Sequence, residues 1–163
     1  MEINETNKKC YLLAIKMLAK KDYSRHKLSK KLIDRKFEKA IVNEVIDYLV
    51  EEKYLKEEYY IEARIKGFMY KNYSPDYIQQ KLNQEFCYPE MEQITTIFRE
   101  YNYDSEFQIK DLIRKKLNLM TVEKDNAQKS REKLIRFVLS KGHSYGEASG
   151  YINHAIDEQL NTH

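Results

Sequence analysis

The segment EEKYLKEEYY, residues 51–60, holds the densest group of side chains that could do acid–base chemistry. Four carboxylates, Glu51, Glu52, Glu57 and Glu58, flank a Tyr-Leu pair. A catalytic pair of carboxylates needs two acids that converge in a pocket with their pKa values pushed apart. Here two of the acids end one expected helix and two begin the next, where a negative charge favourably meets the helix dipole. We therefore interpret them as helix-terminal residues.

The histidines and cysteines show no spacing typical of a metal site or an activated nucleophile. His143 and His154 lie apart without a HExxH pattern, and His163 is the terminal residue. Cys10 and Cys87 are too few and too distant for a disulfide framework or a CxxC metal site. No glycine-rich phosphate loop occurs either. The sequence therefore predicts no enzyme, no metal and no cofactor.

What remains is positive charge. The formal net charge is only +3, yet residues 8–39 hold twelve Lys or Arg against three acids. Such asymmetry indicates either a polyanionic or acidic partner or simply a solvated lysine face. Our candidate partner-binding residues, chosen by charge and position, are Lys27, Lys30, Lys31, Arg64, Lys66, Lys71, Arg114, Lys115, Arg131 and Arg136.

The elements that position these cations are marked by a repeated tetrapeptide. KDYS at 21–24 returns as KNYS at 71–74 and as KGHS at 141–144. Each serine is followed by apolar residues at +4 and +8, the stripe of a helix, so we expect Ser24, Ser74 and Ser144 to be N-caps. Pro75 suits a first helical position. Ser144 and Glu147 have the spacing of a capping box.

Amphipathic stretches before and after each cap predict a unit of three helices, repeated after about 50 residues. We expect repeats over 1–52, 53–102 and 103–163, the third with an additional helical segment, and about nine helices in all. Only four Gly and two Pro argue against a β-rich fold. The predicted class is all-α, with tandem helix-turn-helix-like units in an elongated, curved array. No apolar run is long enough to span a membrane, and we expect a cytoplasmic monomer.

With these motifs in place, the chain resembles the RecX family of regulatory proteins. Residues 54–82 match its most typical segment through Leu55, Glu57, Tyr60, Lys71, Tyr73, Pro75, Ile78 and Leu82. Leu28 and Leu32 match the paired leucines of the family's first repeat, and residues 134–152 resemble its closing segment. Asn72 and Ser74 stand where glycines are common in the family.

The resemblance implies a non-enzymatic regulator of the RecA recombinase. Such proteins bind within the groove of the RecA–single-stranded-DNA filament and restrain its growth, ATP turnover and strand exchange. Regulation of DNA repair, homologous recombination and the SOS response follows from that role.

Two other functions stay open from the sequence. One is a DNA-binding module, because residues 24–39 form a basic helix inside a three-helix unit. No Asn or Gln suited to base readout lines that helix, so DNA contact would be weak, non-specific and salt-sensitive. The other is an α-helical adaptor for a different protein.

Overall fold

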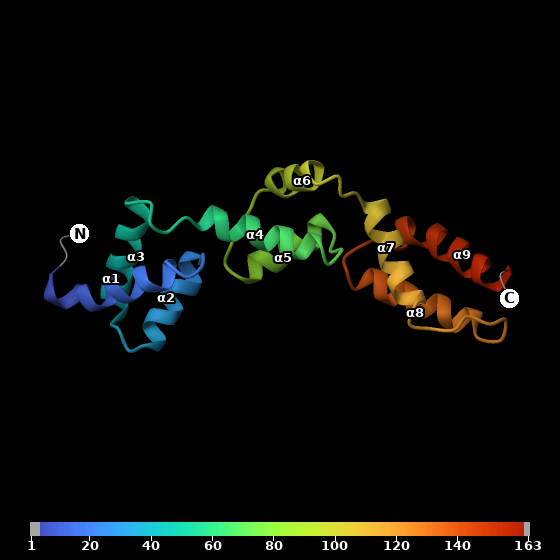
Figure 1. The fold of residues 1–163 in the computed structure, drawn as a ribbon, viewed down its shortest axis with the longest axis horizontal. Coiled ribbons are helices and arrows are strands. Elements are labelled where there is room, and N and C mark those ends of the chain that lie inside the picture. Colours follow the sequence, from blue (N-terminus) through green and yellow to red (C-terminus); the bar gives the residue numbers. More distant parts are fainter. Residues whose placement is uncertain (1–3, 162–163) are drawn as a thin grey trace. The chain divides into compact units, whose positions relative to one another are not determined.

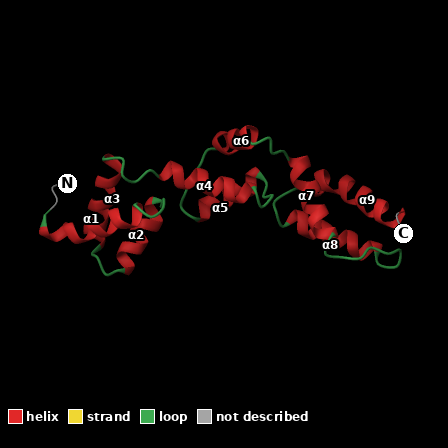
Figure 2. Ribbon diagram, in the orientation of Figure 1, coloured by secondary structure: helices red, strands yellow, loops and turns green. Residues whose placement is uncertain are grey.

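A computed structural model describes residues 4–161 of the chain. Within this range all regular structure is helical, and no strand occurs (Figure 2). The nine helices, in chain order in Figure 1, are α1 (Glu5–Leu18), α2 (Arg25–Asp34), α3 (Lys39–Glu51), α4 (Glu57–Met69), α5 (Pro75–Gln84), α6 (Met91–Glu100), α7 (Ser105–Leu117), α8 (Ala127–Leu139) and α9 (Tyr145–Asn161). The predicted all-α class is confirmed. The repeat boundaries and the curved, elongated arrangement stay predictions.

The chain divides into two compact units. One contains the residues up to Arg64 together with Leu82–Cys87; the other contains Ile65–Lys81 and the residues from Tyr88 onward. In the first unit, α3 packs against both α1 and α2, while α1 and α2 touch each other less. In the second unit, α7, α8 and α9 all pack against one another. Each set of three helices encloses its own apolar core.

The predicted caps are present. The Ser24 hydroxyl accepts a hydrogen bond from the Lys27 N–H at 3.2 Å, and α5 begins at Pro75 after Ser74. Ser144 and Glu147 form the expected reciprocal capping box, with bonds of 3.1 and 3.3 Å. The apolar positions at +4 and +8 from each serine are all buried. The tetrapeptides therefore end one helix and start the next, as the pattern predicted.

The copies do not occupy the same place in their three-helix sets. KDYS and KNYS lie between the first and second helices of α1–α3 and α4–α6, whereas KGHS lies between α8 and α9. Because α7 precedes α8 in this set, the third copy comes one helix later in its set than the other two copies do.

Five of the tight turns that close helices use residues other than glycine. Lys36, Lys53, Asn72, Phe86 and Asn102 all have φ between 53° and 71°, the left-handed region in which a helix is closed. In each case the next N–H bonds to the carbonyl five residues back, as in a Schellman motif. Asn72 shows why asparagine replaces glycine in the second tetrapeptide, since its short side chain tolerates this conformation.

The second and third tetrapeptides touch each other within the second unit. The Ser74 N–H donates to the Lys141 carbonyl at 2.9 Å, and His143 Nε2 lies 2.9 Å from the Asn72 carbonyl. Gly142 has φ of 88°, and a Cβ there would lie 2.4 Å from Tyr77 Cβ. Only glycine fits where these two turns meet.

Candidate partner-binding surface

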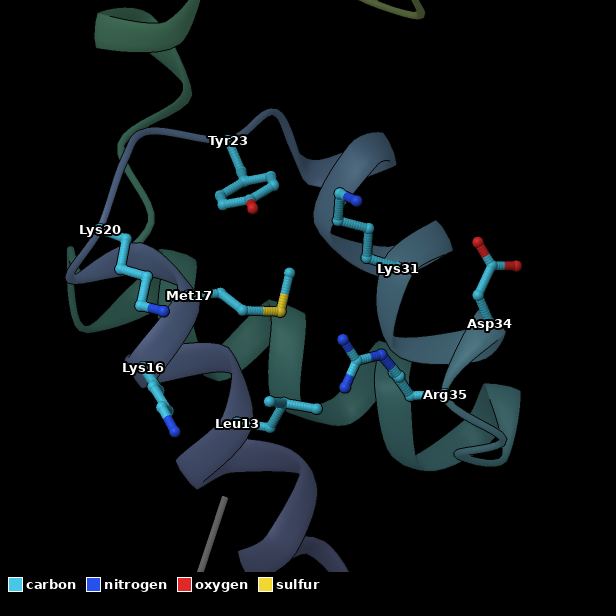
Figure 3. Close-up of a pocket in the computed structure, with 8 residues that line it drawn as sticks. All are labelled: Leu13, Lys16, Met17, Lys20, Tyr23, Lys31, Asp34 and Arg35. Carbon is cyan, nitrogen blue, oxygen red and sulfur yellow. The ribbon is translucent and has the colours of Figure 1, made fainter.

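A groove lies between α1 and α2 in the first unit, with a volume of about 380 Å³. It exists because both helices rest on α3 and leave a gap where they face each other. Figure 3 shows the side chains that line it: Leu13, Lys16, Met17 and Lys20 from α1 and the turn after it, Tyr23, and Lys31, Asp34 and Arg35 from the end of α2.

The rim of the groove is basic, and its cations have no counter-ion among residues 4–161. Among the described residues, none of Lys16, Lys20, Lys31 and Arg35 takes part in an ion pair. Asp34 is the one carboxylate in the lining, and its carboxylate points away from the other labelled side chains (Figure 3). The groove thus presents uncompensated positive charge to any ligand that enters it.

The floor of the groove is apolar. Leu13 and Met17 are half-buried and pack against the first core, and Tyr23 is 8% exposed. The Arg35 guanidinium reaches from the end of α2 toward Leu13 (Figure 3). A ligand in this groove would therefore meet methyl and thioether groups beneath a ring of cations.

A second basic region of the same unit is built differently, around Glu85 at the end of α5. Its carboxylate accepts hydrogen bonds from Lys27 Nζ at 3.1 Å, the Tyr60 hydroxyl at 2.9 Å and Arg64 Nε at 3.1 Å. The second carboxylate oxygen pairs with the Arg64 guanidinium, and Lys27 also contacts the Tyr60 hydroxyl. We call these four residues the Glu85 cluster.

The Glu85 cluster shifts the pKa values of its members. Burial on its own raises the pKa of Glu85, but the hydrogen bonds from Arg64, Lys27 and Tyr60 outweigh it and hold the pKa below its usual value. Burial lowers the pKa of Lys27, yet its bonds to Tyr60 and Glu85 prevail and raise it. Glu85, Lys27 and Arg64 are therefore charged at neutral pH, and the cluster ties α2 to α4 and the end of α5.

In the second unit, Asp111 on α7 forms a comparable cluster. Its carboxylate pairs with Arg114 at 2.6 Å and Lys115 at 2.5 Å, and accepts a hydrogen bond from Asn72 Nδ2 at 2.6 Å. Burial opposes ionisation, but the bonds from Lys115, Arg114 and Asn72 lower the pKa of Asp111 to about 2. Asn72 Oδ1 is buried without a hydrogen-bond partner among the described residues. The side-chain amide of Asn72 is therefore held in place by its nitrogen, through the bond to Asp111.

The remaining predicted cations fall into two groups. Lys66 Nζ lies 5.0 Å from the centre of the Tyr101 ring, and Arg131 Nε donates to Asn153 at 2.8 Å. Lys30, Lys71 and Arg136 are exposed, and none of them forms an ion pair with another described residue. The ten candidates therefore do not form one patch: Lys31 lines the groove, four belong to the two carboxylate clusters, and the others lie elsewhere.

Within residues 4–161, no three His, Cys, Asp or Glu side chains are grouped so that they could hold a metal ion. His163 lies outside the described residues. No helix in the same range is long and apolar enough to cross a membrane. His143 is buried in the contact between the turns, and burial raises the pKa of the Cys10 thiol to about 11, so this thiol is held protonated.

Comparison with known proteins shows which proteins this chain is similar to. The model of the first three-helix domain of RecX matches residues 10–49, which include the whole groove. The regulatory protein RecX of Vibrio parahaemolyticus is 27% identical over 136 residues, covering 83% of this chain and 84% of that protein. Together with the matches below, these similarities support a RecX family protein.

Two further relatives agree with this placement. The regulatory protein RecX of Clostridium perfringens is 27% identical over 139 residues, covering 84% of this chain and 64% of that longer protein. The crystal structure of RecX from Lactobacillus salivarius has a TM-score of 0.65 at 17% identity, covering 96% of this chain and 98% of the other, which shows a shared fold. Both curated relatives are named as regulatory proteins.

Sequence reasoning missed the groove. It selected Lys31 but not Lys16, Lys20 or Arg35, because it searched one helix at a time. The signal was present as the cations at 16, 20, 31 and 35, which recur near the ends of two successive amphipathic helices. Glu85 was missed as well, because nothing near it in the sequence indicates three distant partners.

Proposed function

We propose that this chain regulates the RecA recombinase by binding the RecA–single-stranded-DNA filament and restraining its activity. Membership of the RecX family supports a RecA partner. The chain would act without catalysis of its own, as a cytoplasmic monomer, and would thereby regulate DNA repair and recombination.

The observation that carries the proposal is the basic groove in the first three-helix domain. The family match covers this domain. The groove in it is lined by cations that have no counter-ion among the described residues. A filament of protein and DNA is a large, negatively charged object, and complementary charge speeds and orients docking onto such a partner.

Eight of the ten candidate cations divide into two groups, while Lys66 and Arg131 already contact the Tyr101 ring and Asn153 and would add secondary contacts. Four exposed cations form no ion pair with another described residue, and we propose them as principal contacts with the filament: Lys30, Lys31, Lys71 and Arg136. Lys27, Arg64, Arg114 and Lys115 are already paired with Glu85 or Asp111, so they would add secondary contacts and chiefly hold the contact surface in shape. Any direct DNA contact would be weak and salt-sensitive, since it would reach phosphates rather than bases.

The test is ATP hydrolysis by RecA on single-stranded DNA, with increasing amounts of the full chain. The chain alone should hydrolyse no ATP and should slow turnover by RecA. Lys30→Glu with Lys31→Glu should relieve that inhibition on the order of tenfold in effective concentration, because two attractive contacts become repulsive.

A matched control is Lys39→Glu with Lys129→Glu, which changes the net charge equally. Both lysines are exposed, neither forms an ion pair with a described residue, and neither lines the groove. This variant should inhibit as well as the original chain. Unchanged RecA turnover at saturating, folded protein would refute the proposal. A duplex footprint that survives raised salt would favour a sequence-specific DNA-binding module instead.

A further inference from the structure

The groove between α1 and α2 combines two features that call for different chemistry in its ligand. The rim offers four cations without an ion-pair partner in the described part of the chain, and these favour carboxylate or phosphate oxygens. The floor offers the side chains of Leu13 and Met17, which favour an aliphatic or aromatic group. A ligand that satisfies both must carry an anionic group and an apolar group within a few ångströms of each other.

Single-stranded nucleic acid meets the first requirement but not the second. Proteins bind it through a basic track with aromatic rings on which the bases stack. Among the described residues that line this groove, the only aromatic side chain is that of Tyr23. It is 8% exposed, and Lys21 Nζ lies over its ring at 5.1 Å from the centre. No ring face is therefore open to a base.

An acidic peptide meets both requirements. A leucine-sized side chain would cover Leu13 and Met17, and methionine adapts its unbranched chain to different ligand shapes. Neighbouring carboxylates would reach Lys16 and Lys20 on one wall and Lys31 and Arg35 on the other (Figure 3). The volume of about 380 Å³ is near the lower end for ligand sites, roughly 300–1,000 Å³, so the groove suits a few side chains rather than a folded domain.

We propose that this groove binds an acidic segment of a protein partner, with one apolar side chain on the Leu13–Met17 floor and carboxylates on the four cations. The inference deepens the proposed function, which would make the recombinase the source of the segment. It assigns the groove to protein rather than to DNA.

The test is direct binding to the full chain without recombinase, so its failure is separate from a failure of RecA regulation. The probes are a fluorescent peptide with several glutamates around one leucine, the same peptide with serine for leucine, and an oligothymidylate. The leucine peptide should bind tightest. Replacing its leucine should weaken binding roughly fivefold, as expected for partial burial of one aliphatic side chain.

Two variants locate the binding. Lys20→Glu with Lys31→Glu should weaken peptide binding on the order of tenfold or more, while the Lys39→Glu and Lys129→Glu control should bind normally. Met17→Ser should weaken binding of the leucine peptide about fivefold and leave the serine peptide unaffected. If the charge-reversed variant proves unfolded by circular dichroism, Lys20→Ala with Lys31→Ala replaces it, with a smaller loss of the same sign expected.

Three outcomes would overturn the proposal. Equal binding of the leucine and serine peptides would mean that the floor takes no part. Tighter binding of the oligothymidylate, lost in the charge-reversed variant, would make the groove a phosphate site. No binding of the peptide, or binding that survives charge reversal, would remove the groove as a peptide site altogether.

Discussion

Lys27 and Lys31 are one turn apart on α2, yet they belong to regions of opposite character. Lys27 is held by Glu85 and Tyr60, in a cluster whose two cations share one carboxylate. Lys31 faces the groove, where no cation has a partner among the described residues. Both are basic residues on one short helix, but one stabilises the fold and the other is available to a ligand. The position of the nearest carboxylate, rather than the number of lysines, makes the difference.

The largest expected effect comes from removing the carboxylate of the paired region. Glu85→Ala removes the carboxylate that partly buried Lys27 and Arg64 share, and deletes four hydrogen bonds. Because both cations can regain some water, we expect a loss of about 2 kcal/mol in the free energy of unfolding rather than the full cost of a buried ion. Urea denaturation measures it, and a loss no greater than that of an exposed glutamate such as Glu132→Ala would contradict the compensated character of this cluster.

The Asp111 cluster extends the comparison to the second unit and adds a dependence on pH. The pKa of Asp111 is lowered from 3.8 to about 2, so its stabilisation is fully present above 3.8 and is lost as the pH falls through about 2. At neutral pH, Asp111→Asn should cost about 1–2 kcal/mol, allowing for partial solvent screening.

The informative quantity is the gap in unfolding free energy between the original chain and Asp111→Asn, since other carboxylates titrate in both. The gap should narrow steadily between about pH 4 and about pH 2. A gap independent of pH would mean that the aspartate acts through packing or neutral hydrogen bonds alone. Chemical denaturation at a series of pH values provides the measurement.

The features that could be predicted are those determined by residues close together in the sequence. Ser24 with Leu28 and Leu32 specifies a capped helix and its buried face within nine residues, and Ser144 with Glu147 specifies a capping box. These features depend on the periodicity of one helix and on hydrogen bonds to its own backbone. Sequence patterns report such local effects directly.

The parts that could not be predicted depend on which helices approach each other. Lys27 and Glu85 are 58 residues apart, and the contact between the Ser74 and Lys141 turns spans a still longer separation. The groove is a consequence of two helices resting on a third. Helical periodicity shows which face of a helix is buried but not which neighbouring helix covers it. The sequence therefore could not show which cations pair with a carboxylate and which remain available to a ligand.

A smaller effect tests this separation on α2 itself. Lys27→Met keeps the aliphatic stem but removes the ammonium group from the Glu85 cluster, and should cost roughly 0.5–1 kcal/mol, the value of a partly exposed ion pair. Lys31→Met should change the unfolding free energy by less than about 0.5 kcal/mol, as for an exposed residue without a partner. If urea denaturation showed the same loss of unfolding free energy for both variants, Lys27 would be no more tightly held by its neighbours than Lys31.

The smallest effect is expected where the groove cations are removed together. Lys20→Ala with Lys31→Ala relieves repulsion around the groove, but it also removes a cation that meets the C-terminal dipole of α2, where Lys31 lies in the last turn. The two effects oppose each other, so the free energy of unfolding should stay within about 0.5 kcal/mol of the original at low salt. Raising the salt to about 1 M screens both effects and should shrink even that difference, since the Debye length falls to about 3 Å. A stability loss above about 1 kcal/mol would show that these cations have counter-ions within the chain, and the groove would then be a second compensated cluster rather than a surface open to a ligand.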